Sequence, residues 1–179
     1  MARQTFDESG VAVTIIKYRC DGFTEEHWNR WKADSVGVQV AMNDRLSSTK
    51  LENDEGHRVY HLHMKMPLII SNRTIITTFY EHNDEATGFR NVFHSSQGNE
   101  VIIAARKDEI GSDVVANMLL TFMSSKPYEG GMEMNQVIAM DVAGRIPGMI
   151  KNKIAKKLSN IGMQVSDYMM HGTIPKGMF

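Results

Sequence analysis

Apolar and polar residues alternate along most of this chain, in runs that turn residues separate. A period of two places successive side chains on opposite faces of a β-strand, so each run predicts a strand with one apolar face. Because the runs follow one another directly, we expect a meander of antiparallel strands whose apolar faces lie on one side of a sheet. The runs cover residues 11–19, 36–42, 58–66, 72–81, 88–95, 114–126 and 132–142, with a shorter run before the turn at 53–56.

A short helix is predicted after the first strand, from Thr24 to about residue 33. Thr24 is a favourable N-cap, and two glutamates follow it in the first turn, where negative charge suits the helix dipole. Phe23 and Trp28 occupy the two positions of a hydrophobic staple. Residues 97–112 are ambiguous, because their apolar run fits either a strand or a helical turn.

The last long segment, residues 144–171, follows the periodicity of a helix. Pro147 suits a first helical position, and no further proline interrupts the segment. Its apolar residues recur every three or four positions, which places them on one helix face. That face consists of Ile150, Ile154, Leu158, Ile161, Val165 and Tyr168 or Met169. We expect a helix of about 24 residues that covers the apolar face of a curved sheet and leaves an apolar cavity beneath it.

The composition is that of a soluble globular protein, and we assign all 179 residues, 1–179, to one domain. The 20 basic and 21 acidic residues nearly cancel, so we expect no nucleic-acid partner. The single cysteine, Cys20, excludes an internal disulfide and favours a reducing, cytoplasmic location. The N-terminal residues lack the apolar core of a signal peptide, and no apolar run is long enough to predict a membrane-spanning helix.

Two short motifs resemble a known family. Gly144-Arg145-Ile146-Pro147, preceded by a strand that ends near Asp141 and followed by Asn152, resembles the start of the lid helix in START (StAR-related lipid-transfer) domains. Pro67 followed by Ser71-Asn72-Arg73 resembles the opening of a strand in the same family. With the order of predicted elements, the resemblance covers residues 10–171.

The chain also departs from the START pattern. It has no predicted helix before its first strand, and the arginine-rich signature of the family is missing at residues 109–113. These departures leave a broader Bet v 1-like relative open. The resemblance implies an α+β helix-grip fold, in which a curved antiparallel sheet of about seven strands wraps around a long C-terminal helix. It also implies a hydrophobic cavity that holds a lipid or sterol-like molecule, without a cofactor.

The predicted ligand-binding residues are inward-facing positions of the strands and of the last helix. Core and cavity walls share one composition, so ordinary core packing accounts for each of them equally well. The candidates are Tyr60, Leu62, Met64, Arg73, Met118, Leu120, Phe122, Ile138, Met140, Ile150, Ile154, Leu158 and Ile161. The 14 methionines favour a roomy interior, although plain core packing explains them equally well.

Arg73 is the charged member of this set. If it points inward, its guanidinium could anchor a lipid headgroup or a carboxylate. A strand-end ion pair with Glu81 or Asp141 is the interpretation that we favour.

Three histidines of one predicted strand and four lysines of the final helix can each be interpreted as solvent-exposed residues or as functional ones. His57, His61 and His63 share the strand face opposite the apolar one, so we expect them to face solvent and to bind no metal. Four lysines on the final helix could meet an anionic membrane surface during lipid transfer, although a solvated helix face accounts for them more readily. They are Lys151, Lys153, Lys156 and Lys157.

We therefore expect a carrier of an apolar ligand, with the final helix as its lid, and not an enzyme. No nucleophile motif, phosphate-binding loop, dinucleotide fingerprint or pair of carboxylates appears, so no catalytic residue is assigned. Two alternatives stay open. One is an enzyme on the same scaffold, with Arg73, Tyr80 or Glu81 in the pocket, and the other is a regulatory protein-binding module with a filled core.

Overall fold

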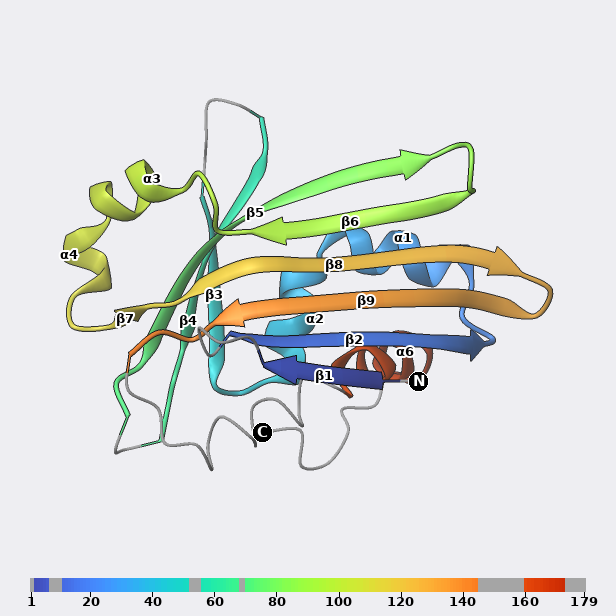
Figure 1. The fold of residues 1–179 in the computed structure, drawn as a ribbon, viewed down its shortest axis with the longest axis horizontal. Helices are drawn as coiled ribbons and strands as arrows, with labels where there is room; N and C mark the ends of the chain where they lie inside the picture. Colours follow the sequence, from blue (N-terminus) through green and yellow to red (C-terminus); the bar gives the residue numbers. More distant parts are fainter. Residues whose placement is uncertain (1, 7–10, 52–55, 68–69, 145–159, 173–179) are drawn as a thin grey trace.

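The computed structural model describes residues 2–6, 11–51, 56–67, 70–144 and 160–172 of the chain (Figure 1). The strands are β1 (Ala2–Phe6), β2 (Ala12–Asp21), β3 (Leu46–Leu51), β4 (Arg58–Met64), β5 (Arg73–Asp84), β6 (Phe89–Ser95), β7 (Val114–Val115), β8 (Asn117–Tyr128) and β9 (Gly131–Asp141). The helices are α1 (Glu25–Ala33), α2 (Ser35–Met42), α3 (Glu100–Ala105), α4 (Lys107–Ile110) and α6 (Ile161–His171).

One curved sheet organises the described part of the chain, with strand order β1-β2-β9-β8-β6-β5-β4-β3. All neighbours along this path are antiparallel, and the short β7 adds a parallel pairing to β5. The predicted α+β class with a curved antiparallel sheet is confirmed. The sheet has nine strands in the described residues, against the expected seven, because β1 and β7 extend it.

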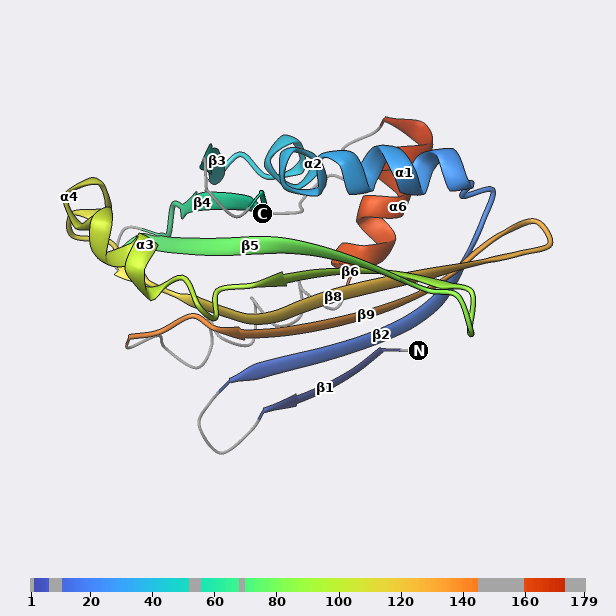
Figure 2. The same ribbon diagram turned by 90° about the horizontal axis from the view of Figure 1, so that it is seen from above.

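Helices α1, α2 and α6 lie together over one face of the sheet, which we call the inner face (Figure 2). The predicted start of α1 is confirmed: the Thr24 side chain accepts a hydrogen bond from the His27 backbone N–H. Phe23 and Trp28, the staple residues, are both almost completely buried. Helix α6 ends at Gly172, whose φ of +68° closes the last turn.

Only the second half of the predicted C-terminal helix belongs to the described residues. Its first half, residues 145–159, lies outside them, and with it lie the predicted ligand-binding residues Ile150, Ile154 and Leu158. Within the described part, no helix is long and apolar enough to cross a membrane.

The strand predicted at residues 36–42 is wrong, because this segment forms helix α2. Asp34 begins the helix: its side chain accepts a hydrogen bond of 2.9 Å from the Gly37 N–H. The helix buries Val36 and Met42 against the inner face. Alternating β-branched residues resemble a strand, but the cap and the burial of one helix face outweigh that local preference. The ambiguous residues 97–112 form the short helices α3 and α4.

The predicted direction of Leu120 and Phe122 is also wrong. A β-bulge between Met118 and Leu120 shifts the register by one residue, so that Leu120 pairs with Ala139 and Phe122 with Val137. Paired residues point to the same face, and the alternating burial of β9 places Ala139 and Val137 on the outer face. Leu120 and Phe122 therefore face away from α6, while Met118 faces it.

The two faces of the sheet carry separate hydrophobic clusters. The inner core, under α1, α2 and α6, contains Phe23, Trp28, Trp31, Val36, Met42, Leu46, Tyr60, Leu62, Ile75, Phe79, Val92, Ala116, Met118, Met123, Met132, Met134, Met140, Val165 and Met169. The outer core, between β3–β5 and the helices α3 and α4, contains Leu51, Val59, Ile76 and Ile110, with Ile102, Ile103 and Val115 packed against them.

Candidate functional site

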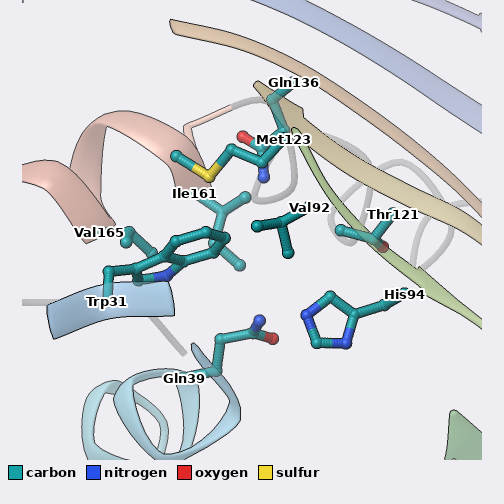
Figure 3. A pocket seen from close by; sticks show the side chains of 9 residues that line it. All are labelled: Trp31, Gln39, Val92, His94, Thr121, Met123, Gln136, Ile161 and Val165. Carbon is teal, nitrogen blue, oxygen red and sulfur yellow. The ribbon is translucent and has the colours of Figure 1, made fainter. Parts of the chain in front are cut away.

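A small cavity lies between α6 and the inner face of the sheet (Figure 3). Its volume is about 20 Å³, which is enough for one water molecule. Its walls combine apolar side chains with four polar ones. They are Trp31, Gln39, Val92, His94, Thr121, Met123, Gln136, Ile161 and Val165.

Strand register places the floor of this cavity. Val92 pairs with Met123, and His94 pairs with Thr121, so four side chains from β6 and β8 lie side by side on the inner face. The bulge in β8 is what brings Thr121 and Met123 to this face. Ile161 and Val165 are four positions apart, about one turn of α6. Both therefore lie on the helix face that covers the cavity.

Two polar atoms in the cavity wall are buried without a hydrogen-bond partner among the described residues. They are Trp31 Nε1 and Gln136 Oε1. The two residues are only 4% and 6% exposed. Buried polar groups in folded proteins almost always have a partner, so an unpaired donor and an unpaired acceptor in one cavity mark a place where a polar group can be bound.

His94 is the titratable residue of the cavity wall. Its Nε2 lies 3.1 Å from the Ser35 hydroxyl, and its ring packs edge-on against Phe79. Burial disfavours the charged imidazolium and, with a smaller effect from the nearby Arg58, lowers the pKa of His94 to about 4. The imidazole is therefore neutral at physiological pH, and the cavity wall contains no carboxylate, lysine or arginine among the described residues.

Helix α6 contacts the sheet closely through a glycine. A Cβ built at Gly162 would lie 2.3 Å from Gln136 Oε1 and 3.0 Å from the Tyr18 hydroxyl, so a larger residue would push the helix outward. The Tyr18 hydroxyl lies 3.2 Å from Ser166 Oγ on the next turn. Burial raises the pKa of Tyr18, which keeps the phenol neutral. Helix α1 also contacts α6, because the Arg30 guanidinium donates a hydrogen bond to the backbone carbonyl of Met169.

Several predicted ligand-binding residues belong to the inner face. Four of them, Tyr60, Leu62, Met118 and Met140, are buried members of the inner core. Ile138 is also buried, and Met64 packs against the inner core. Ile161 is the predicted residue that also lines the cavity. The predicted residues that do not line the cavity either belong to the surrounding core or, like Leu120 and Phe122, point to the outer face of the sheet.

Arg73 lies at one end of the inner face, where it holds backbone segments together. It is 2% exposed, and its guanidinium donates to the carbonyls of Val142 (2.7 Å), Ala143 (3.0 Å) and Ser71. Arg73 thus joins the end of β9 to the start of β5. Its donors bind the protein's own backbone, which leaves the cavity without a cation from this residue.

The predicted ion pair of Arg73 with Glu81 or Asp141 is wrong. Glu81 pairs with Lys32 at 2.5 Å, and Asp141 Oδ1 accepts a hydrogen bond from the Ala143 N–H. Backbone carbonyls satisfy the guanidinium instead, among them that of Ala143, whose φ is +49°.

The expectation that His57, His61 and His63 face solvent is wrong for His61, whose side chain is 14% exposed, whereas His63 is partly exposed. His61 Nε2 lies 3.1 Å from Thr74 Oγ1, and His63 Nδ1 lies 2.7 Å from Asp113 Oδ2. Helices α3 and α4 cover this face, which the sequence pattern left open. His57 is exposed, as predicted. Within the described ranges, no group of three or more histidine, cysteine, aspartate or glutamate residues is placed to hold a metal ion.

The polar wall of the cavity was not predicted. A signal exists in the sequence: Gln136 interrupts the apolar alternation of β9 between Met134 and Ile138, and His94 follows Val92 at an inward position of β6. A polar residue at a buried position of an otherwise apolar face indicates a bound polar group or an internal partner.

No protein-family model and no curated protein matches the sequence. The fold, in contrast, is similar to solved structures of START domains. The human StAR-related lipid transfer protein 5 superposes with a TM-score of 0.66 over 96% of this chain and 86% of that chain, at 10% identity. The lipid transfer and protein localization domain of human StarD13 gives 0.64 over 98% and 85%, at 11% identity. A STAR-related lipid transfer protein fragment from Xanthomonas axonopodis gives 0.61 over 96% and 97%, at 14% identity. The chain therefore has the START-type helix-grip fold that its motifs predict.

Proposed function

We propose that this protein binds one lipid-like apolar molecule between α6 and the inner face of the sheet. The observation that carries the proposal is the methionine-rich inner core around the cavity. Seven methionines are buried there: Met42, Met118, Met123, Met132, Met134, Met140 and Met169. Methionine side chains are unbranched and adjust their shape, which suits a wall that must rearrange around a ligand. The similarity in fold to three proteins named for lipid transfer supports the same proposal.

The cavity must expand for this ligand to enter. A volume of about 20 Å³ holds one water molecule, whereas lipid-sized ligands occupy pockets of roughly 300 Å³ or more. Rotation of methionine side chains and movement of α6 away from the sheet are the two sources of that space. Each buried CH₂ of the ligand contributes about 0.8 kcal/mol of affinity, so a long alkyl chain compensates for the displaced contacts.

We further propose binding without catalysis. The polar residues that line the cavity among the described residues are neutral, and none is a carboxylate, lysine or arginine. General acid–base chemistry needs a group that exchanges protons near the working pH. With the pKa of His94 lowered to about 4, its imidazole is a weak base for that role.

The direct test is the content of the purified full-length chain. Native mass spectrometry and organic extraction should find a co-purified apolar molecule, or the delipidated protein should take one up from a mixture of sterols, long-chain alcohols, fatty acids and phospholipids. Uptake must raise the midpoint of thermal unfolding, since a ligand that binds only the folded state stabilises it. If no apolar molecule is found and none can be loaded, the proposal fails.

The role of α6 as a lid has its own test. Ser166 on α6 lies close to the thiol of Cys20 on β2, so Ser166→Cys brings two thiols together. Oxidation of this variant should tie α6 to the sheet and slow ligand exchange at least tenfold, and reduction should restore the wild-type rate. Ser166→Ala, which cannot form the disulfide, is the matched control. Equal exchange rates in the oxidised and reduced variant would show that α6 is not the lid.

We also propose that the protein carries its ligand between membranes in the cytoplasm. The four lysines at residues 151–157 would contact an anionic surface. The measurement is the rate of transfer of a loaded fluorescent lipid to vesicles with and without phosphatidylserine. Replacement of all four lysines by glutamine should remove the difference between the two kinds of vesicle.

A further inference from the structure

The outer face of the sheet carries a straight row of apolar side chains that crosses five strands. Each member of the row is paired directly with the next in the strand register, so the row runs at right angles to the strands. We call it the apolar row. In order across β2, β9, β8, β6 and β5, its members are Ile15, Val137, Phe122, Phe93 and Tyr80.

The apolar row is open to solvent. Ile15 is 49% exposed and Tyr80 is 39% exposed. Phe93 and Phe122 are half-buried, and their ring centroids lie 5.1 Å apart. Helices α1, α2 and α6 lie on the opposite face of the sheet, and α3 and α4 cover its β3–β5 end (Figures 1 and 2). A continuous apolar surface that none of these helices covers marks an interaction site.

A polar row with charges of both signs runs parallel to the apolar row, nearer the turn between β8 and β9. Arg19 of β2 pairs with Glu133 of β9, which pairs with Lys126 of β8. Lys126 Nζ lies over the ring of Phe89 on β6, 5.5 Å from its centroid, and Phe89 pairs with Asp84 of β5. The row therefore begins with a cation on β2 and ends with a carboxylate on β5.

We propose that two copies of this chain pack outer face against outer face, around a two-fold axis that runs along β8. β8 is the middle one of the five strands, so the axis places β2 of one copy opposite β5 of the other. Ile15 then faces the partner's Tyr80, and Phe122 faces the partner's Phe122. Apolar side chains thus cover apolar ones along the whole row.

The polar rows match under the same axis. Arg19 lies opposite the partner's Asp84. Lys126 reaches over β6, which faces β9 of the second copy, so its ammonium group lies opposite the partner's Glu133. Each pair occurs twice because the axis is two-fold. Opposite charges that meet when apolar surfaces meet favour this orientation over others.

The area of this surface suits a weak dimer. Five strands at about 4.8 Å span about 24 Å, and four rows of alternate residues span about 27 Å along the strands. The two copies together then bury about 1,300 Å², at the lower end of specific interfaces. The sheet curves around α6, so its outer face is convex and contact is confined to these central rows (Figure 2). We expect a dissociation constant in the micromolar range.

A membrane surface is a poorer occupant of this face. Side chains of a sheet stand level with one another, so no apolar group projects far enough to enter a lipid layer. Glu133 and Asp84 would also be repelled by anionic headgroups. The inference does not depend on a bound ligand, because the outer face lies on the side of the sheet away from α6.

Sedimentation velocity of the full-length chain, from about 1 to 300 µM, is the first test. The mass should rise from 20.2 kDa towards twice that value with concentration. Ile15→Glu buries a carboxylate opposite the partner's Tyr80 and should weaken the dimer at least tenfold. Val101→Glu makes the same kind of change at an 81% exposed residue of α3, outside the apolar row, and should leave the dimer unchanged.

Disulfide formation at high protein concentration tests the two-fold axis. The background is Cys20→Ser, which removes the cysteine of the natural chain. Phe122→Cys lies on the axis and should form a disulfide with the same residue of a second copy. Ile15→Cys alone should not, but mixed with Tyr80→Cys it should give the mixed disulfide.

Each outcome supports or overturns the dimer. A chain that stays monomeric up to 300 µM overturns it, and the apolar row then belongs to another partner. Binding to vesicles of phosphatidylcholine and phosphatidylserine by a monomeric chain would identify a membrane as that partner. A dimer that Ile15→Glu leaves intact shows that another surface pairs. If circular dichroism shows that Ile15→Glu is unfolded, the disulfide pattern decides.

Discussion

The two faces of the sheet are packed in different ways. Among the described residues, the inner core contains seven buried methionines and a cavity whose wall includes polar atoms without a hydrogen-bond partner. The outer core of the described residues, in contrast, consists of leucine, isoleucine and valine side chains and contains no methionine. β-Branched side chains are stiff at χ1 and methionine is flexible. One sheet thus carries an adaptable face under α6 and a fixed face under α3 and α4.

The polar groups differ between the faces as the apolar ones do. Asn99, at the start of α3, accepts a hydrogen bond from Thr78 at 3.0 Å and donates to the carbonyls of Ile76 and Ser95. Gln136 on the inner face has a buried oxygen without a partner among the described residues. The paired amide of Asn99 attaches α3 to the sheet, while the Gln136 oxygen has no partner in the described part of the chain and is available to a polar group.

The largest expected effect comes from removing one buried side chain from each core. Ile76→Ala should destabilise the protein by about 4 kcal/mol and Met123→Ala by about 2 kcal/mol, because flexible neighbours fill a hole better than stiff ones. Both residues are almost fully buried. Urea unfolding monitored by tryptophan fluorescence gives the two values. Equal losses, or a larger loss for Met123→Ala, would contradict the contrast between the cores.

The two buried amides give a smaller contrast. Asn99→Ala should cost about 2–3 kcal/mol, because Thr78 and two backbone carbonyls lose their partner. Gln136→Met should cost about 1 kcal/mol or less, because the oxygen that it removes has no partner among the residues that the structure describes. The same unfolding experiment measures both. A cost for Gln136→Met that matches Asn99→Ala would mean that the inner amide is structurally paired.

His94 predicts a pH dependence that belongs to the inner face. Its folded-state pKa of about 4 lies below the ordinary value of 6.5, so the unfolded chain binds the proton more tightly. The resulting stability is fully present above pH 6.5 and is lost as the pH falls towards 4. Between pH 7 and pH 5 the wild type should lose about 2 kcal/mol more than His94→Gln, which cannot titrate. If the two proteins lose the same amount, His94 is not neutral in the folded state.

The smallest expected effect is on the outer face, at the ion pair of His63 and Asp113. The pair is partly exposed, with the His63 side chain at 35% and the Asp113 side chain at 14%. Asp113→Asn should therefore cost less than about 1 kcal/mol, as exposed ion pairs do. Asp108→Asn, at an exposed residue of α4, is the control. A loss well above 1 kcal/mol would show that this pair, and not the outer core, holds α4 in place.

The sequence predicted the parts of this protein that depend on local order. Alternation at period two located the strands, and the capping signals around Thr24 located α1, because these patterns are set by residues close together in the chain. The predicted class of fold is confirmed, and the motifs at residues 67–73 and 141–152 resemble START domains, whose fold the structure shares.

Other features depend on contacts between distant residues, and only the tertiary structure decided them. Residues 36–42 became a helix because Asp34 caps it and the inner core buries one of its faces. One extra residue in β8 exchanged the faces of Leu120 and Phe122 with those of Thr121 and Met123. The chain alone thus determined a curved sheet with an apolar inner side. Which side chains meet under α6, and which polar atoms remain unpaired there, depends on register and on packing across the fold, which no local pattern records.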